Sequence, residues 1–112
     1  MRLYCNTCTI PVTAELKEFK DTAQLNEVDG EPYVPQGYYV ISDGEYLTGS
    51  EGNVLINPED LINCKDHSDT SRLQGCCGPA GTHGPNKTCS NGHEIATLFG
   101  DCWQAHVVMF CP

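Results

Sequence analysis

Short apolar runs separated by polar turns dominate the middle of the chain. Tyr38-Tyr39-Val40-Ile41 is rich in strand-forming residues and stops at Ser42-Asp43-Gly44. Because Asp-Gly between two apolar runs is a strong signal for a β-hairpin, residues 45–48 are expected to form the return strand. Val54-Leu55-Ile56 would add a third strand. The pattern therefore predicts a three-stranded meander over residues 38–57.

Two more strands are expected toward the C-terminal end. Residues 94–99 are followed by a turn at Gly100-Asp101, and a last strand is predicted over residues 103–110. Its final part, residues 107–110, is uniformly apolar, which is typical of a central strand that is buried on both faces.

Helical signals are weak. Residues 13–20 could form a short helix of about two turns, which is marginal without packing. Asn57 followed by Pro58 and two acidic residues predicts one capped helical turn, with Leu61 and Ile62 as its buried side chains. The chain is therefore expected to be mainly β with a small α content, as one domain over residues 1–112.

The composition supports a small domain that needs an additional staple. The chain has 112 residues, of which 39% are hydrophobic, so its core can only be thin and a metal or cross-link would help. No run approaches the roughly 20 apolar residues that span a membrane, so no membrane association is expected. The first cysteine already stands at position 5, which leaves no room for a secretory signal, and a cytoplasmic location is expected.

The formal charge of −9 is unevenly distributed along the chain. Residues 1–60 hold eleven acidic residues against three basic ones, whereas residues 61–112 hold four against three. Nucleic-acid binding depends on Lys and Arg that neutralise phosphates, and this chain has six, spread singly. Nucleic acid is therefore an unlikely partner, and a protein or a small-molecule ligand is expected instead.

The pair Cys5 and Cys8 is the most specific chemical signal among the eight cysteines. In a reducing compartment, cysteines serve more often as metal ligands than as disulfides. A redox C-x-x-C opens a helix, but Thr-Ile-Pro-Val follows Cys8 and favours a strand. The spacing therefore predicts half of a tetrahedral metal site on a turn between two strands.

The second half of that site is expected in the glycine-rich loop over residues 74–92, which has little reason to be ordered without a metal. The predicted ligand set is Cys5, Cys8, Cys77 and Cys89, with Cys76 as the close alternative to Cys77. Four thiolates leave no open position for water, so the predicted ion is a structural Zn²⁺.

The remaining cysteines and the histidines lack ligand spacing. Cys64, Cys102 and Cys111 are expected to be buried free thiols. The histidines are scattered, at His67, His83, His93 and His106. The enzymatic alternative would use Cys102, or Cys76 and Cys77, with a nearby histidine such as His106, although no known catalytic motif is present.

Several aromatic residues could line a pocket for a cation, although building a small core is the more common role of such residues. They are Tyr33, Tyr38, Tyr39, Tyr46 and Trp103.

The cysteine motifs resemble those of a family of small cysteine-rich bacterial proteins with no established activity. The matching segments are Cys5-x-x-Cys8, Pro11-Val12-Thr13, His67-Ser68-Asp69, Arg72-Leu73, Gly75-Cys76-Cys77-Gly78, Gly84-Pro85-Asn86, Cys89, Glu94-Ile95-Ala96-Thr97 and Asp101-Cys102-Trp103. In that family a cysteine often stands where this chain has Asn91. More loosely, two cysteine half-sites that bracket a β insertion resemble zinc ribbons and the zinc-stapled β-tent of Yippee and cereblon-domain proteins, which implies an antiparallel architecture. The sequence thus predicts a non-catalytic, zinc-binding β-domain that binds a protein or small ligand.

Overall fold

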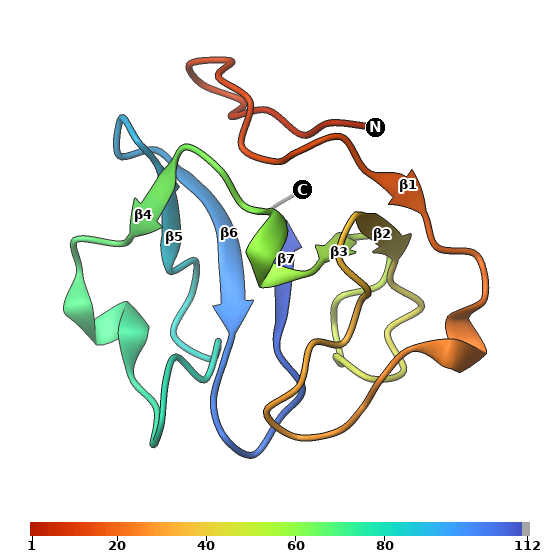
Figure 1. Cartoon of the computed structure of the whole chain (residues 1–112). Coiled ribbons are helices and arrows are strands. Elements are labelled where there is room, and N and C mark those ends of the chain that lie inside the picture. Colours follow the sequence, from red (N-terminus) through yellow and green to blue (C-terminus); the bar gives the residue numbers. More distant parts are fainter. Residues whose placement is uncertain (111–112) are drawn as a thin grey trace.

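One seven-stranded sheet organises the protein. The structure, a computed structural model, describes residues 1–110. The strands lie in the order β1-β2-β3-β7-β6-β5-β4 (Figure 1). Their bounds are Lys17–Glu18 (β1), Tyr38–Ile41 (β2), Val54–Ile56 (β3), Cys64–Asp66 (β4), Lys87–Cys89 (β5), Glu94–Phe99 (β6) and Val107–Phe110 (β7). All pairs are antiparallel except β1 with β2. The prediction of a mainly β domain is confirmed.

Strand β7 occupies the centre of the sheet and is buried on both faces, as its apolar sequence predicted. Val107 and Val108 are both fully buried, but they belong to different core clusters. In the neighbouring β3, Leu55 and Ile56 likewise belong to different core clusters. This alternation follows from the two-residue period of a strand. The sheet therefore has a core on each face.

The core cluster that matters most for the cysteines lies beneath the N-terminal segment. It contains Val12 and Leu16 of that segment, together with Ile56, Ile95 and Val108 of the sheet. Cys5 and Cys89 are part of the same cluster. The N-terminal residues thus pack against one face of the sheet. In Figure 1 this segment, drawn in red, runs above the upper ends of the strands.

The helical turns are short 3-10 segments: Thr22–Gln24 (η1), Pro58–Asp60 (η2) and Thr70–Leu73 (η3). The predicted turn at Asn57 is confirmed, because the Asn57 side chain accepts a hydrogen bond from the Glu59 N–H at 2.8 Å. Its buried residue is Asp60, which accepts from the Gly37 N–H at 2.7 Å, whereas Ile62 is exposed. Hydrogen bonding to the backbone makes burial of this carboxylate possible.

Several predicted elements differ in the structure. The two strands expected around the Cys5–Cys8 turn are reduced to one isolated bridge, between Tyr4 and Pro11. Residues 13–20 form no helix, because their backbone groups bond outward: the Lys17 N–H donates to Gly37 and the Phe19 N–H to Tyr39. Residues 45–48 form no strand, since β3 pairs directly with β2 and the segment between them extends away as a loop. The last strand begins only at Val107.

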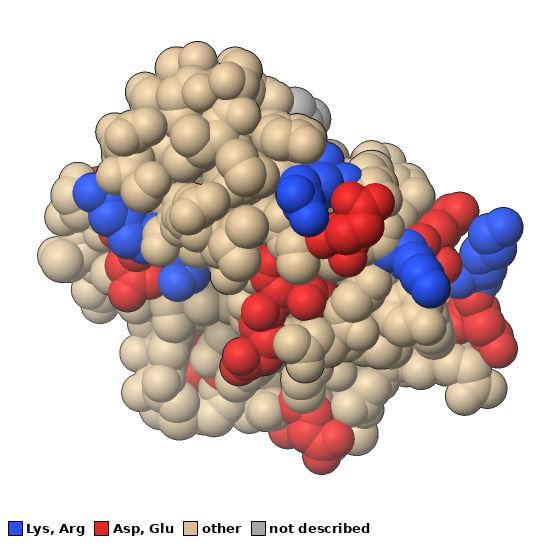
Figure 2. Space-filling view, turned by 45° about the horizontal axis from the view of Figure 1, so that its top comes forward, with Lys and Arg blue, Asp and Glu red and all other residues tan. Residues whose placement is uncertain are grey.

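Several charged side chains on the surface form ion pairs. Figure 2 shows basic side chains next to acidic ones on the face drawn there. Ion pairs join Arg72 to Glu94 at 2.9 Å and Lys87 to Asp66 at 2.8 Å. Among the described residues, no helix has the length and apolar character needed to cross a membrane.

Candidate metal centre and pocket

Four potential metal ligands from two distant segments meet at one edge of the sheet. They are Cys5, Cys8, Cys89 and His93, and their donor atoms all lie within 4.8 Å of one another. The Cys8 Sγ to Cys89 Sγ distance is 3.7 Å, and His93 Nδ1 lies 3.7 Å from Cys5 Sγ and 3.4 Å from Cys89 Sγ. A tetrahedral zinc site has S···S edges of about 3.8 Å and S···N edges of about 3.6 Å. These residues could therefore hold a metal ion.

The first two ligands come from a tight turn near the N-terminus. An isolated antiparallel bridge between Tyr4 and Pro11 closes the turn, and the Cys5 N–H donates to the Ile10 carbonyl at 2.9 Å. Thr9 adopts a left-handed backbone conformation, with φ of 64°, and donates its N–H to the Cys5 carbonyl. The turn therefore presents both thiols on one side, as the C-x-x-C spacing predicted.

The other two ligands come from the hairpin that joins β5 to β6. The Cys89 N–H donates to the His93 carbonyl at 2.8 Å, and the Gly92 N–H donates to the Cys89 carbonyl at 2.9 Å. Gly92 has φ of 88°, which a side chain would rarely allow. This closed turn places the Cys89 thiol and the His93 ring next to each other.

Hydrogen-bond donors around the cluster favour thiolates at two of the cysteines. The Asn91 side-chain amide, 3.4 Å from Cys8 Sγ, is the main group that lowers the pKa of Cys8 to about 7. The backbone N–H of Cys8 holds the pKa of Cys5 below its usual value. Burial raises the pKa of Cys89, with the N–H groups of His93 and Asn91 acting against it. Asn91 therefore supports the site by donating a hydrogen bond to one of its thiols.

The structure brings together three of the four predicted ligands, Cys5, Cys8 and Cys89, and places Cys77 elsewhere. Cys77 is grouped with Cys76 and Cys102 beside the far end of β6. The six residues of β6 span about 20 Å, which separates the two ends. Cys77 and its alternative Cys76 are therefore too far away to complete the first group.

His93 takes the fourth place, and sequence reasoning missed it. The signal was present as Cys89-Ser-Asn-Gly-His93, a C-x₃-H spacing that matches the separations of ligand pairs in zinc sites. The spacing does not stand out in the sequence, because the four histidines are scattered along the chain and three thiols already satisfied most of the predicted site.

The second cysteine group surrounds one carboxylate. The sulfur atoms of Cys76, Cys77 and Cys102 lie within 4.8 Å of one another, and all three residues are exposed. Backbone N–H groups, first that of Cys77, hold the pKa of Asp101 well below its usual range. The expectation of a buried Cys102 is wrong, because the turn after β6 turns its side chain outward.

The enzymatic alternative requires a histidine next to Cys76, Cys77 or Cys102, and the described residues place none there. No histidine belongs to the second cysteine group within residues 1–110, and the ring of His106 contacts the Asp101 carbonyl instead, at 3.2 Å. The neighbouring Cys77 thiol, partial desolvation and the Asp101 carboxylate raise the pKa of Cys102 to about 12.

Two other cysteines lie outside these groups. Cys64 is half-buried in β4, where its backbone pairs with that of Cys89, and burial raises its pKa. Cys111 lies outside the described residues, so its predicted burial stays a prediction.

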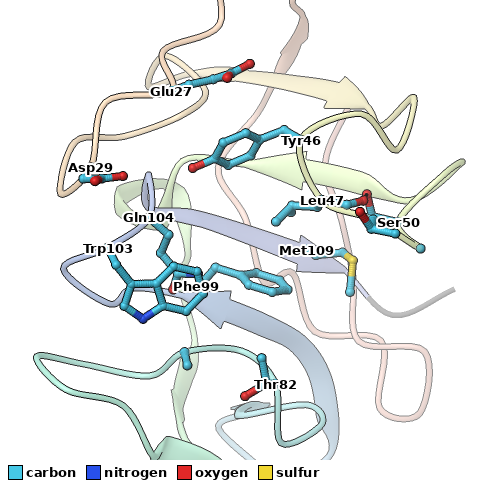
Figure 3. A pocket seen from close by; sticks show the side chains of 13 residues that line it. Glu27, Asp29, Tyr46, Leu47, Ser50, Thr82, Phe99, Trp103, Gln104 and Met109 are labelled. Atoms are coloured by element: carbon cyan, nitrogen blue, oxygen red, sulfur yellow. Dashed lines mark hydrogen bonds between the residues drawn. The ribbon is translucent and has the colours of Figure 1, made fainter.

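A cavity of about 460 Å³ opens on the other core face, away from the first cysteine group. Figure 3 shows Tyr46 on one side of it and Phe99 with Trp103 on the other. Tyr46 stacks on Tyr33, with ring centroids 4.7 Å apart, and its hydroxyl accepts a hydrogen bond from the Ala105 N–H. Two of the five aromatic residues considered from the sequence, Tyr46 and Trp103, thus line one pocket.

Acidic side chains lie at the mouth of this pocket. Glu27 and Asp29 are among its lining residues and lie on the Tyr46 side (Figure 3). An adjoining cavity is lined by Asp43 and Glu45 as well as Glu27. Basic residues are missing from both described linings. The pocket is therefore mainly apolar with a negatively charged rim.

Comparison of the chain with protein-family models, with curated proteins and with solved structures found no match. The resemblances of the cysteine motifs to known families therefore stay predictions.

Proposed function

We propose that the protein is a non-catalytic binding module whose fold is stapled by one structural Zn²⁺ ion. Cys5, Cys8, Cys89 and His93 would hold the ion. The observation that carries this proposal is the match between three of their donor separations, 3.4–3.7 Å, and the edges of a zinc tetrahedron. Three thiolates and one imidazole are a ligand set that zinc accepts in structural sites.

A structural role follows from the number and burial of the ligands. Four protein donors fill the tetrahedral shell, so no position remains for a reacting water. Cys5 and Cys89 are 2% and 0% exposed. The ion would join the N-terminal turn to the β5–β6 hairpin, and so hold the N-terminal segment over its core face.

The ligand of the module would occupy the pocket between Tyr46 and Trp103. Its volume of about 460 Å³ falls within the range of small-molecule sites. Aromatic faces attract cations, and the acidic residues Glu27 and Asp29 at the rim add to that attraction. The chemistry therefore favours a small organic cation with an apolar body.

Elemental analysis of the purified protein tests the metal assignment. One zinc per chain is expected, and Cys8→Ser or His93→Gln should reduce the bound zinc. Cys64→Ser serves as the matched control, because this half-buried cysteine lies beside the site without belonging to it. Full zinc retention in Cys8→Ser would contradict the assignment.

A pair of isosteric probes tests the pocket separately. Choline should change the fluorescence of Trp103, whereas its neutral analogue 3,3-dimethyl-1-butanol should bind more weakly. Asp29→Asn should reduce this preference. Tyr4→Leu, a substitution of an exposed aromatic residue outside the pocket, should leave it unchanged. Equal binding of both probes would reject a cation site while leaving the zinc assignment untouched.

A further inference from the structure

The second cysteine group is assembled from two loops at the end of β6 opposite the proposed zinc site. Cys76 and Cys77 lie on the loop that follows η3, and Cys102 lies in the turn between β6 and β7. Their sulfur atoms lie within 4.8 Å of one another, although about 25 residues separate the two segments. All three side chains are exposed to solvent. The group therefore offers three convergent thiols to a solute.

Asp101 holds this arrangement in place from beneath. Its Oδ1 accepts hydrogen bonds from the N–H groups of Cys77 and Cys102, at 2.8 and 2.7 Å. Its Oδ2 accepts from the Cys76 N–H and from Trp103 Nε1, both at 2.9 Å. An ionised carboxylate has about four acceptor positions, so these donors occupy all of them. Asp101, which is 1% exposed, is therefore a positioning residue rather than a further ligand.

Two glycines allow the cysteine loop to approach this carboxylate. A Cβ at Gly75 would collide with the Gly78 carbonyl oxygen and would lie 2.8 Å from Asp101 Oδ2. A Cβ at Gly78 would lie 2.6 Å from the Gly100 carbonyl oxygen. The backbone can fold this closely only because both side chains are absent. The convergence of the thiols is thus built by the loop, by the carboxylate and by the glycines together.

The donor set selects the kind of metal. Within residues 1–110, no fourth Cys, His, Asp or Glu donor joins the three thiols. Zinc in structural sites takes four protein ligands, which this group does not supply. Soft thiolate ligands favour Cu(I), a soft cation that does not depend on a fourth donor.

We propose that Cys76, Cys77 and Cys102 form a second metal site, for one Cu(I) ion, distinct from the site formed by Cys5, Cys8, Cys89 and His93. Exposure of all three ligands makes the ion accessible to exchange with other thiols in solution. The two sites thus divide by role: the buried one holds the fold and the exposed one carries a labile ion.

Copper titration of the zinc-loaded full chain tests this site. The protein, kept anaerobic with a phosphine reductant, would be mixed with Cu(I) bound to bicinchoninate, whose colour is lost as copper transfers. One Cu(I) per chain is expected, with the bound zinc retained by elemental analysis. X-ray absorption at the copper edge should show three sulfur neighbours. Displacement of zinc by copper, or two sulfur neighbours only, would overturn the proposal.

Variants identify the residues responsible. Loss of a residue that supports a metal ligand usually weakens metal binding by roughly 10–100-fold, and Asp101→Asn should weaken Cu(I) binding within that range. Cys102→Ser removes a ligand itself and should weaken Cu(I) binding by more. Cys64→Ser should bind copper as the parent protein does. Retained zinc shows that each variant still folds. If Cys102→Ser loses its zinc, Cys77→Ser on the other loop is used in its place. Parental copper affinity in the folded thiol variant would reject the site.

Discussion

The two cysteine groups occupy opposite ends of β6 and differ in almost every physical respect. At the start of the strand, Cys89 and His93 join Cys5 and Cys8 in a four-donor cluster that is largely withdrawn from solvent. At its end, three exposed thiols surround Asp101. The same residue type therefore stands in two different environments, one largely buried beside a histidine and one exposed around a carboxylate.

The interactions that hold the cysteine loops in place also differ between the two groups. Backbone hydrogen bonds shape each turn of the first group, but among the described residues few such bonds connect its two turns directly. Asn63 connects the two turns indirectly: its side chain donates to the Pro11 carbonyl, and its own carbonyl accepts from the Ser90 N–H, both at 2.8 Å. The second group has a buried carboxylate, Asp101, which joins its own loop to the other one by accepting from the N–H groups of Cys76 and Cys77. Two further hydrogen bonds, from Cys102 and Trp103, order the loop that Asp101 belongs to. A metal is thus expected to matter for folding at the first group and much less at the second.

The largest expected effect is that of metal removal. A strong chelator should abolish the cooperative unfolding transition, because zinc contributes about 10–16 kcal/mol in small zinc domains and a domain is stable by only about 5–15 kcal/mol. Circular dichroism during heating measures the transition, and alkylation should then label Cys5 and Cys89. Re-added zinc should restore the transition, and Mg²⁺ should not. An unchanged transition in chelator would show that the first group needs no metal.

A smaller effect is expected from Gly78→Ala, which disturbs the second group alone. The new methyl group would meet the Gly100 carbonyl oxygen, so the free energy of unfolding should fall by about 1–3 kcal/mol. Urea unfolding measures this change, and bound zinc should stay at one per chain. Gly100→Ala is the matched control, because its methyl group meets only the flexible Leu98 side chain, at 3.3 Å. Zinc loss in Gly78→Ala would show that the two groups are coupled.

Asn91→Ala should weaken the first group without destroying it. Loss of the amide that donates to Cys8 Sγ should lower zinc affinity by about 10–100-fold, the usual cost of removing a supporting hydrogen bond. Competition with a zinc indicator measures the affinity. Ser90→Ala, in an exposed position of the same turn, should bind zinc as the parent does. Equal affinities for the two variants would remove Asn91 from the site.

The smallest effect is expected at Cys64, which lies near the first cysteine group but belongs to neither group. This thiol is half-buried beside Cys89 but is not among the grouped donors. Cys64→Ser should change the free energy of unfolding by less than about 1 kcal/mol and leave zinc content unchanged. Thermal unfolding with elemental analysis checks both. A large loss of zinc would extend the first group to a fifth residue.

Local signals in the sequence predicted the elements whose causes are themselves local. The strand over residues 94–99 and the capped turn at Asn57 were both predicted from neighbouring residues alone, and the structure confirms them. The apolar run at 107–110 also indicated a central strand correctly. The segment 13–20 was predicted wrongly because its backbone partners are distant in the chain. The segment 45–48 was predicted wrongly because β2 pairs with the later strand β3 instead.

The sequence by itself determined that this is a mainly β chain in which Cys5 and Cys8 share one turn, since both properties depend on short-range spacing and strand preference. Only the tertiary structure decided which residues face that turn. His93 reaches it because the β5–β6 hairpin closes at the same sheet edge, whereas Cys77 is held by Asp101 at the other end of β6. A ligand set composed of distant segments is fixed by strand order and length, and these arise from packing of the whole sheet rather than from any one motif.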